Sequence, residues 1–289
     1  MQYLESETMY ENWLSIVLAV IPVIILFIVI YRKDRFSAEP VGQLAKAFAL
    51  GVASVFASFL VSIPLGTLGF YVDEPVSVGD CVRISLFGAA LPEELAKLFM
   101  LWLAVGKNRY FDEKMDGIVY SVCVALGFAA TENIMYLIGL KGEELYSLAV
   151  SRGLCSVPGH FGFGVLMGYY YYYSLVRFND ARKFRSLLLI APVLAHTAFN
   201  TVLFVMDLTP MLYSVLEIGF VLICVGLWRN GNKKIAAHIA ADKEVMGTIG
   251  VVEVDGGNVA GNVGEGVKND GGIDENFTLL SGKSSGRLL

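Results

Sequence analysis

The chain has 289 residues, of which 55% are hydrophobic and only 17% are charged, and its mean hydropathy is +0.60. A soluble domain carries about 25% charged residues, so this composition excludes an ordinary soluble protein and indicates a polytopic membrane protein. The net charge of −5, with no basic stripe, argues against a nucleic-acid partner.

The first predicted element is a membrane-spanning helix over 13–31, "WLSIVLAVIPVIILFIVIY". The acidic start of the chain lacks the basic region of a signal peptide, so we expect this helix to be retained. Six further segments reach the roughly 20 residues needed to cross a hydrocarbon core: 42–66, 83–105, 117–139, 154–176, 186–206 and 211–228. The predicted fold class is therefore all-α, a polytopic bundle of about seven transmembrane helices. The third and fifth helices are the least apolar, which indicates that the others shield them from lipid.

The loops predict the orientation of this bundle. Lys and Arg are concentrated after the first, third, fifth and seventh helices, in "RKDR", "GKNRYFDEK", "RFNDARKFR" and "WRNGNKK". The alternate loops and the N-terminal segment are poor in both residues. By the positive-inside rule, the N-terminus lies outside and the C-terminus in the cytoplasm.

The character of the sequence changes at about residue 229. Residues 233–246 are compatible with a short cytoplasmic helix, and the rest is rich in Gly, Asn and Asp with little apolar surface. We therefore expect a multipass transmembrane domain over 1–228. A cytoplasmic tail over 229–289 follows, first a short helix and then a flexible segment.

Four predicted helices carry polar groups at membrane depth, where such groups are costly and usually functional. They are Glu93, Glu94 and Lys97 in the third, Glu132 and Asn133 in the fourth, His160 in the fifth, and His196 and Asn200 in the sixth. The chain has three histidines, and two of them fall in these helices.

Helical spacing places several of these residues on common helix faces. Glu93 with Lys97, and His196 with Asn200, are i, i+4 pairs, and Phe128, Glu132 and Tyr136 form a third stripe. A polar face costs less free energy when it points into the bundle than when it points into the lipid, so we expect these faces to share one polar cavity. The glycines of 154–176 allow close approach of neighbouring helices.

Each feature alone has a purely structural explanation, such as an ion pair or an interhelical hydrogen bond. Together they suit hydrolysis, in which a glutamate activates water and a His/Asn pair donates to the oxyanion. Ligation of a metal by His and Glu is the alternative, without an HExxH signature. The four cysteines form no CxxC pair, and no serine lies in a nucleophile turn. Two functions other than hydrolysis remain open, a proton-coupled transporter and a non-catalytic membrane scaffold.

Four motifs in chain order, "EELAK", "FAATENIMY", "HFGFG" and "HTAFN", resemble those of the PrsW intramembrane proteases, relatives of the type II CAAX prenyl endopeptidases. The resemblance covers roughly residues 15 to 228. It implies a hydrolase that cleaves single-pass membrane proteins or membrane-bound peptides, in the manner of site-1 cleavage of anti-sigma factors. It also implies a multi-pass protein of the plasma membrane.

The resemblance implies roles for individual residues. Glu93 would be the general base, and Glu94 would stabilise the site with Lys97 balancing its charge. His196 and Asn200 would stabilise the oxyanion. Glu132 stands where the CAAX peptidases carry a histidine, so His160 would hold the catalytic water. No cofactor is expected in this glutamate mechanism. In the zinc-dependent version the expected ligands are Glu93, Glu132, His160 and His196.

Overall fold

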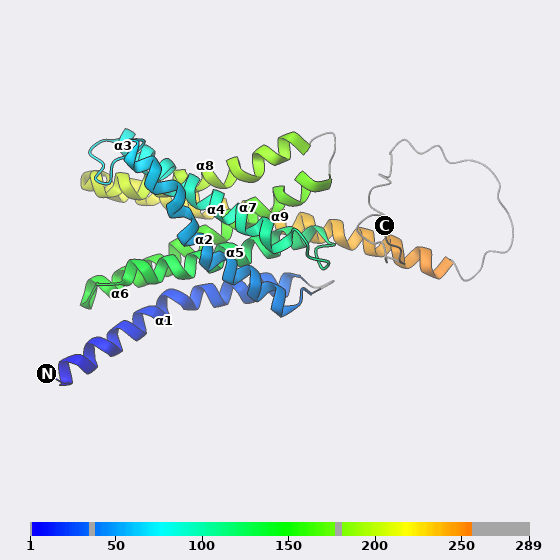
Figure 1. Cartoon of the computed structure of the whole chain (residues 1–289), viewed down its shortest axis with the longest axis horizontal. Coiled ribbons are helices and arrows are strands. Elements are labelled where there is room, and N and C mark those ends of the chain that lie inside the picture. The colour runs from blue at the N-terminus through cyan, green and yellow to red at the C-terminus, as the bar shows by residue number, and fades with distance from the viewer. Residues whose placement is uncertain (1, 35–37, 177–180, 256–289) are drawn as a thin grey trace.

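The protein is described here from a computed structural model covering residues 2–34, 38–176 and 181–255. All regular structure in these residues is helical, as the sequence predicts. The long helices form a bundle, and α1 extends out of it toward the N-terminus (Figure 1). In chain order the helices are α1 (Gln2–Lys33), α2 (Val41–Thr67), α3 (Val78–Arg83), α4 (Leu91–Val105), α5 (Lys114–Leu137), α6 (Gly142–Ser151), α7 (Val157–Val176), α8 (Ala181–Leu208) and α9 (Tyr213–Asp255).

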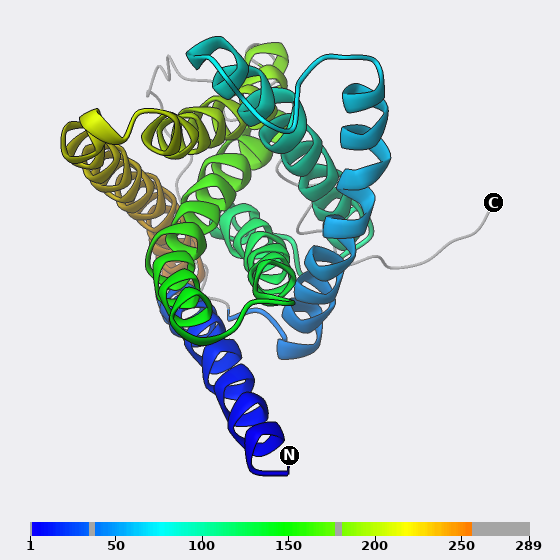
Figure 2. The same ribbon diagram turned by 90° about the vertical axis from the view of Figure 1, so that its left-hand side faces the viewer.

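Helix α5 is the centre of the bundle. In the most apolar stretch of α5, 78% of the residues are buried, whereas the corresponding share is 28% in α1, 28% in α2 and 6% in α9. Figure 2 shows α5 surrounded by the other long helices. Small residues make this placement possible. A Cβ at Gly127 would lie 2.1 Å from the Phe48 carbonyl oxygen of α2, and one at Gly168 of α7 would lie 2.2 Å from that of Gly117. Backbone-to-backbone contact of this kind is typical of helices packed in membranes.

Five helical stretches are long and apolar enough to cross a membrane: Trp13–Lys33, Val41–Thr67, Lys114–Leu137, Arg182–Leu208 and Pro210–Glu244. They correspond to five of the seven predicted spans. The other two, over 83–105 and 154–176, are also helical, and their main helices are α4 and α7, which are not among these five stretches. The count of seven spans and the orientation of the termini stay predictions.

Two short π-helical segments interrupt the bundle at informative places. One, η1 (Ile84–Ala90), joins α3 to α4, and the other, η2 (Arg152–Ser156), joins α6 to α7. Such segments change the direction of the side chains that follow, and they are frequent at functional sites. Both directly precede a motif singled out by the sequence, "EELAK" in α4 and "HFGFG" in α7.

The structure differs from the predicted boundary at 228/229. The seventh predicted span and the short helix over 233–246 are one continuous helix, α9. Ile235 of this helix lies in the main core, and Asp242 caps the start of α5 through the backbone N–H groups of Lys114 and Met115. The bundle therefore continues well beyond 228. The Gly-rich tail over 256–289 lies outside the described residues.

Candidate active site

The predicted site residues come together where α4, α5, α7 and α8 meet. Glu93, Glu94 and Lys97 lie in the first two turns of α4, and all three are buried. The Lys97 Nζ is 2.8 Å from Glu94 Oε1 and 3.5 Å from Glu93 Oε2. The i, i+4 pairing expected from the sequence is therefore present, although the nearer partner of Lys97 is Glu94. The ammonium also lies 4.0 Å from the centre of the Phe128 ring on α5.

His196 of α8 is held by two partners. Its Nδ1 lies 2.9 Å from Glu94 Oε1, and its Nε2 lies 3.2 Å from the side-chain nitrogen of Asn200. A carboxylate only accepts hydrogen bonds, so Nδ1 carries the proton and donates to Glu94. Nε2 then accepts from the Asn200 amide, which keeps its second N–H available. The Phe163 ring stacks on the imidazole with centroids 4.6 Å apart and fixes its plane.

His160 of α7 is engaged at both ring nitrogens. Nε2 lies 3.0 Å from Glu132 Oε2, and Nδ1 lies 3.1 Å from Lys97 Nζ. By the same reasoning Nε2–H donates to Glu132, and Nδ1 accepts from the ammonium. In this arrangement His160 has no free ring nitrogen for the water that the resemblance assigns to it.

Arg152 is the residue that sequence reasoning missed. It lies in η2, and its guanidinium donates to Glu132 Oε2 at 2.6 Å and to Asn133 Oδ1 at 3.0 Å. It also stacks over the Tyr136 ring at 3.8 Å. Glu132, Asn133 and Tyr136 therefore form an outer part of the site joined through Arg152. Its only sequence signal was an isolated arginine in a loop otherwise poor in Lys and Arg.

The hydrogen bonds link these residues into one chain of contacts. It runs from Arg152 through Glu132, His160, Lys97 and Glu94 to His196 and Asn200. Glu93 is at its edge, with a side chain that is 11% exposed, whereas that of Glu94 is 0% exposed. Glu93 Oε2 is 3.9 Å from His196 Nε2. That distance is too long for a hydrogen bond, and it leaves the Glu93 carboxylate free to bond a water molecule beside the imidazole.

Four buried side chains of the cluster could donate to a metal ion. Glu93, Glu94, His160 and His196 each offer an atom within 4.8 Å of the others, with Glu94 in place of the expected Glu132. The Glu94 Oε2 atom is buried and has no partner. However, the Lys97 ammonium lies within 3.5 Å of three of these four residues, where it supplies a positive charge. Lys97 also donates to Nδ1 of His160, and the other ring nitrogen bonds Glu132. As arranged, these residues do not fit a divalent ion.

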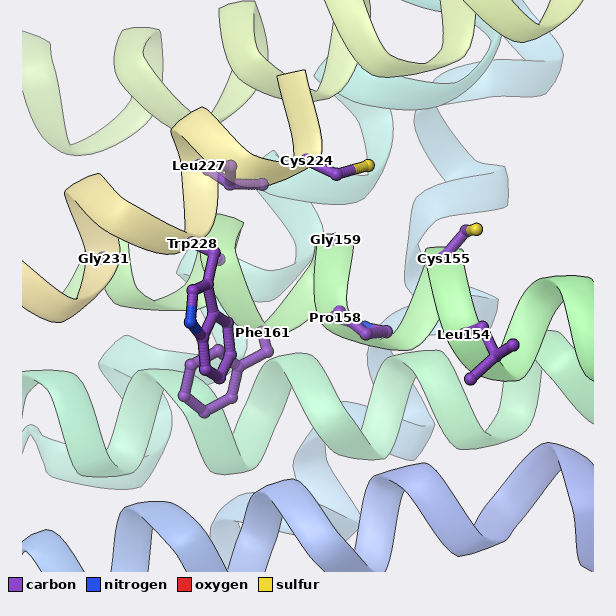
Figure 3. Close-up of a pocket in the computed structure, with 10 residues that line it drawn as sticks. Leu154, Cys155, Pro158, Gly159, Phe161, Cys224, Leu227, Trp228 and Gly231 are labelled. Atoms are coloured by element: carbon purple, nitrogen blue, oxygen red, sulfur yellow. The ribbon is translucent and has the colours of Figure 1, made fainter. Parts of the chain in front are cut away.

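A separate cavity of about 40 Å³ lies between α7 and α9 (Figure 3). Its lining includes Cys155, Phe161 and Trp228 and none of the predicted site residues. In Figure 3 the aromatic rings of Phe161 and Trp228 lie side by side at one end, with the two cysteines, Cys155 and Cys224, toward the other. This apolar packing gap is distinct from the polar cluster.

Comparison with known proteins identifies the family. The model described as "PrsW family intramembrane metalloprotease" matches residues 39–227. "Protease PrsW" of Clostridioides difficile (strain 630) is 32% identical over 234 residues, which cover 79% of this chain and 93% of that protein. "Protease PrsW" of Bacillus subtilis (strain 168) is 35% identical over 183 residues, which cover 63% of this chain and 79% of that protein.

No solved structure matches the chain. The matched region contains all four motifs and every residue of the polar cluster, Arg152 included. With its apolar helices, the protein is a multi-pass integral membrane protein of a bacterial cell membrane, and its substrates are membrane-bound. The chain belongs to the PrsW family of intramembrane proteases.

Proposed function

We propose that this peptidase hydrolyses its substrate with a water molecule activated by Glu93. The observation that carries the proposal is the 3.9 Å separation between Glu93 Oε2 and His196 Nε2, beside a Glu93 side chain that is 11% exposed. A water at this position contacts the Glu93 carboxylate and lies beside the His196/Asn200 pair, whose free Asn200 N–H is the oxyanion donor. A general base must lie within hydrogen-bond reach of the proton it removes, directly or through one water.

The chemical steps balance without another reactant. The Glu93 carboxylate takes a proton from the water as the water oxygen attacks the carbonyl carbon of the scissile peptide bond. The C=O electron pair moves onto the oxygen and forms the oxyanion of a tetrahedral intermediate. The C–N bond then breaks, and Glu93 returns the proton to the departing amine nitrogen.

The His196/Asn200 pair supplies the stabilisation of the oxyanion. Asn200 uses one amide N–H to bond His196 Nε2 at 3.2 Å, and its second N–H is the donor for the oxyanion. Glu94 and Phe163 hold the imidazole in one tautomer and one plane, so the amide is already oriented before substrate binds. Preorganised donors of this kind are usually the largest single contribution to catalysis.

Lys97, Glu132 and His160 act in this proposal as positioning residues. The ammonium offsets the charge of Glu94, and His160 holds the ammonium in place from the far side. Glu132 orients His160, and Arg152 in turn compensates the charge of Glu132. Each buried charge thus has a partner of opposite sign, as burial in low dielectric requires.

The family description names a metalloprotease. A bound zinc ion would supply an acidified water in place of the Glu93 step. Because the Lys97 ammonium lies among the candidate ligands, the arrangement of these residues favours the glutamate version. Metal content decides between the two versions: purified protein in detergent is assayed with phenanthroline and its bound zinc is measured. Full activity in metal-free protein supports the glutamate version, and loss of activity that zinc restores contradicts it.

We further propose that the substrates are single-pass membrane proteins, of the kind represented by anti-sigma factors in site-1 cleavage. The buried position of the cluster among α4, α5, α7 and α8 supports a substrate that reaches the site from the membrane. Membership in a protease family leaves the transporter and scaffold readings without support.

The proposal is tested with a co-expressed single-pass reporter. Glu93→Gln and His196→Ala are each expected to abolish cleavage while membrane insertion and expression stay unchanged. Glu144→Gln, an exposed glutamate of α6, is the matched control and should cleave at the normal rate. Undiminished cleavage by Glu93→Gln and His196→Ala would refute the mechanism. Crosslinking of the Glu93→Gln protein in its native membrane then identifies the substrates that accumulate on it.

A further inference from the structure

An open groove lies at one end of the bundle, where α2 begins and α4 ends. Its volume is about 600 Å³, within the range of about 300–1,000 Å³ that is usual for sites that bind small molecules. Its walls come from the first two turns of α2, the last turn of α4 and the loop that follows α4. Trp102, in the α4 wall, follows Glu93 by nine positions, or about 13.5 Å along the helix axis. The groove is therefore separate from the proposed active site.

The charged side chains that line the groove are all basic. They are Lys46 of α2 and Lys107 and Arg109 of the loop after α4, and all three are exposed. Among the residues that the structure describes, no ion pair joins any of them to an Asp or Glu. The next acids along the chain, Asp112 and Glu113, do not line the groove, and the Glu113 side chain caps α5. The groove therefore offers three cationic side chains to an anion.

The guanidinium of Arg109 is held in place by its neighbour. It donates to the Tyr110 hydroxyl at 2.6 Å, and its Cζ lies 4.8 Å from the centre of the Tyr110 ring. A guanidinium has five N–H donors in a planar fork, so most of them stay available after this contact. Such a fork matches two oxygens of a phosphate group, which it binds in a bidentate manner. Arg109 is therefore suited to a phosphate ligand.

The α4 wall of the groove is apolar and leads toward the lipid. Trp102 and Leu103 are exposed, and so is Phe99, which stacks on Trp102 with ring centroids 6.0 Å apart and lies farther from the loop. The opposite wall belongs to α2, whose apolar stretch Val41–Thr67 is long enough to cross a membrane and begins at the groove. Tryptophan and tyrosine are enriched where a membrane meets water. The groove thus lies at the level of the lipid headgroups.

We propose that this groove binds the phosphate headgroup of an anionic phospholipid. Lys46, Lys107 and Arg109 contact the phosphate oxygens, and the acyl chains extend along the exposed apolar face that contains Trp102. A soluble phosphate compound would meet the same cations but would leave this apolar face uncovered. Basic pockets between membrane helices are typical of sites for acidic lipid headgroups. The proposal does not depend on the mechanism proposed for Glu93.

Trp102 reports on the groove when it is the only tryptophan. The chain has three, and Trp13→Phe with Trp228→Phe removes the other two, both of which are exposed. The full chain is reconstituted in phosphatidylcholine vesicles that contain brominated phosphatidylglycerol or, at the same mole fraction, brominated phosphatidylcholine. Quenching of Trp102 should show an affinity for phosphatidylglycerol at least about tenfold higher. Lys107→Gln and Arg109→Gln should each lower this preference about fivefold, because one Lys or Arg contributes about 1 kcal/mol near an anionic surface.

Two controls separate the groove from general attraction to negative charge and from misfolding. Lys233→Gln removes an exposed lysine of α9 that does not line the groove, and it should keep the full preference. In detergent without added lipid, Lys107→Gln and Arg109→Gln should unfold at the same temperature as the unmodified protein, because both side chains are exposed. Equal quenching of the unmodified protein by the two brominated lipids would overturn the proposal. So would a loss of preference in Lys233→Gln as large as that in Lys107→Gln.

Calorimetric titration with inorganic phosphate distinguishes a lipid from a soluble ligand. We expect no saturable binding of phosphate to the protein in detergent, because phosphate alone makes none of the apolar contacts. Saturable binding that is lost in Lys107→Gln, together with equal quenching of Trp102 by the two lipids, would instead assign the groove to a soluble phosphate compound.

Discussion

Substitution of Lys97 by methionine tests the electrostatic core of the site. The ammonium is 1% exposed and lies 2.8 Å from Glu94. Methionine retains most of the side-chain length and volume, so the main change is the loss of charge. Glu94 is then left as a buried carboxylate whose remaining partner is His196. Removing one partner of a buried ion pair costs about 3–5 kcal/mol, so we expect the free energy of unfolding to fall by about that amount.

The double substitution Lys97→Met with Glu94→Gln separates charge from packing. It removes both members of the pair and leaves neutral groups of similar shape, an exchange that is often tolerated. We expect the double variant to be about 2 kcal/mol more stable than Lys97→Met alone. The effects of Lys97→Met and Glu94→Gln, each measured singly, should therefore not add, as is usual for residues in contact. The double variant should be inactive, because the orientation of His196 depends on the Glu94 carboxylate. Lys97→Met alone should lose activity because Glu94 and His160 both lose the ammonium that positions them.

Thermal and denaturant unfolding in detergent micelles measures these differences. Lys46→Met, at an exposed position of α2, controls for the loss of a lysine and should change stability by less than about 0.5 kcal/mol. If Lys97→Met is as stable as the unmodified protein and shows no coupling to Glu94→Gln, the ammonium is not the counter-charge of the cluster. Lys97 would then also not oppose the binding of a metal ion at that position.

Three further variants test other parts of the structure. Asn200→Ala removes the proposed oxyanion donor, so kcat for reporter cleavage should fall about 10²–10³-fold with little change in KM; a change confined to KM would contradict that role. Arg152→Gln leaves Glu132 without its guanidinium, and cleavage should fall while Arg152→Lys restores part of it; full activity of Arg152→Gln would mean that the outer part of the site is dispensable. Gly127→Ala places a Cβ 2.1 Å from the Phe48 carbonyl oxygen, so we expect the free energy of unfolding to fall by more than about 1–3 kcal/mol. Gly42→Ala is the control and should leave stability unchanged, because a Cβ there has nothing within 4 Å. Equal stability of the two variants would disprove the backbone contact.

The predicted site residues lie together in the structure because the motifs obey helical spacing, while their catalytic roles stay predictions. Glu93 with Lys97, and His196 with Asn200, are one turn apart, so each pair shares a face in any α-helix. The high cost of polar groups in lipid turns those faces inward, and the structure brings them together. The same reasoning overlooked Arg152, because a single arginine in a loop resembles an ordinary surface residue until η2 directs it toward Glu132.

Sequence by itself determined the class of protein, the helical fold and the four motifs, because hydropathy and the 3.6-residue period are local properties of the chain. Only the tertiary structure decided which of these side chains contact one another. Lys97 lies closer to Glu94 than to Glu93. Both ring nitrogens of His160 are hydrogen-bonded, one to Lys97 and the other to Glu132. Helix α9 continues past the expected boundary at 228/229. These outcomes depend on how separate helices cross at their glycines and where π-helical segments rotate them. Spacing within one helix carries no information on either.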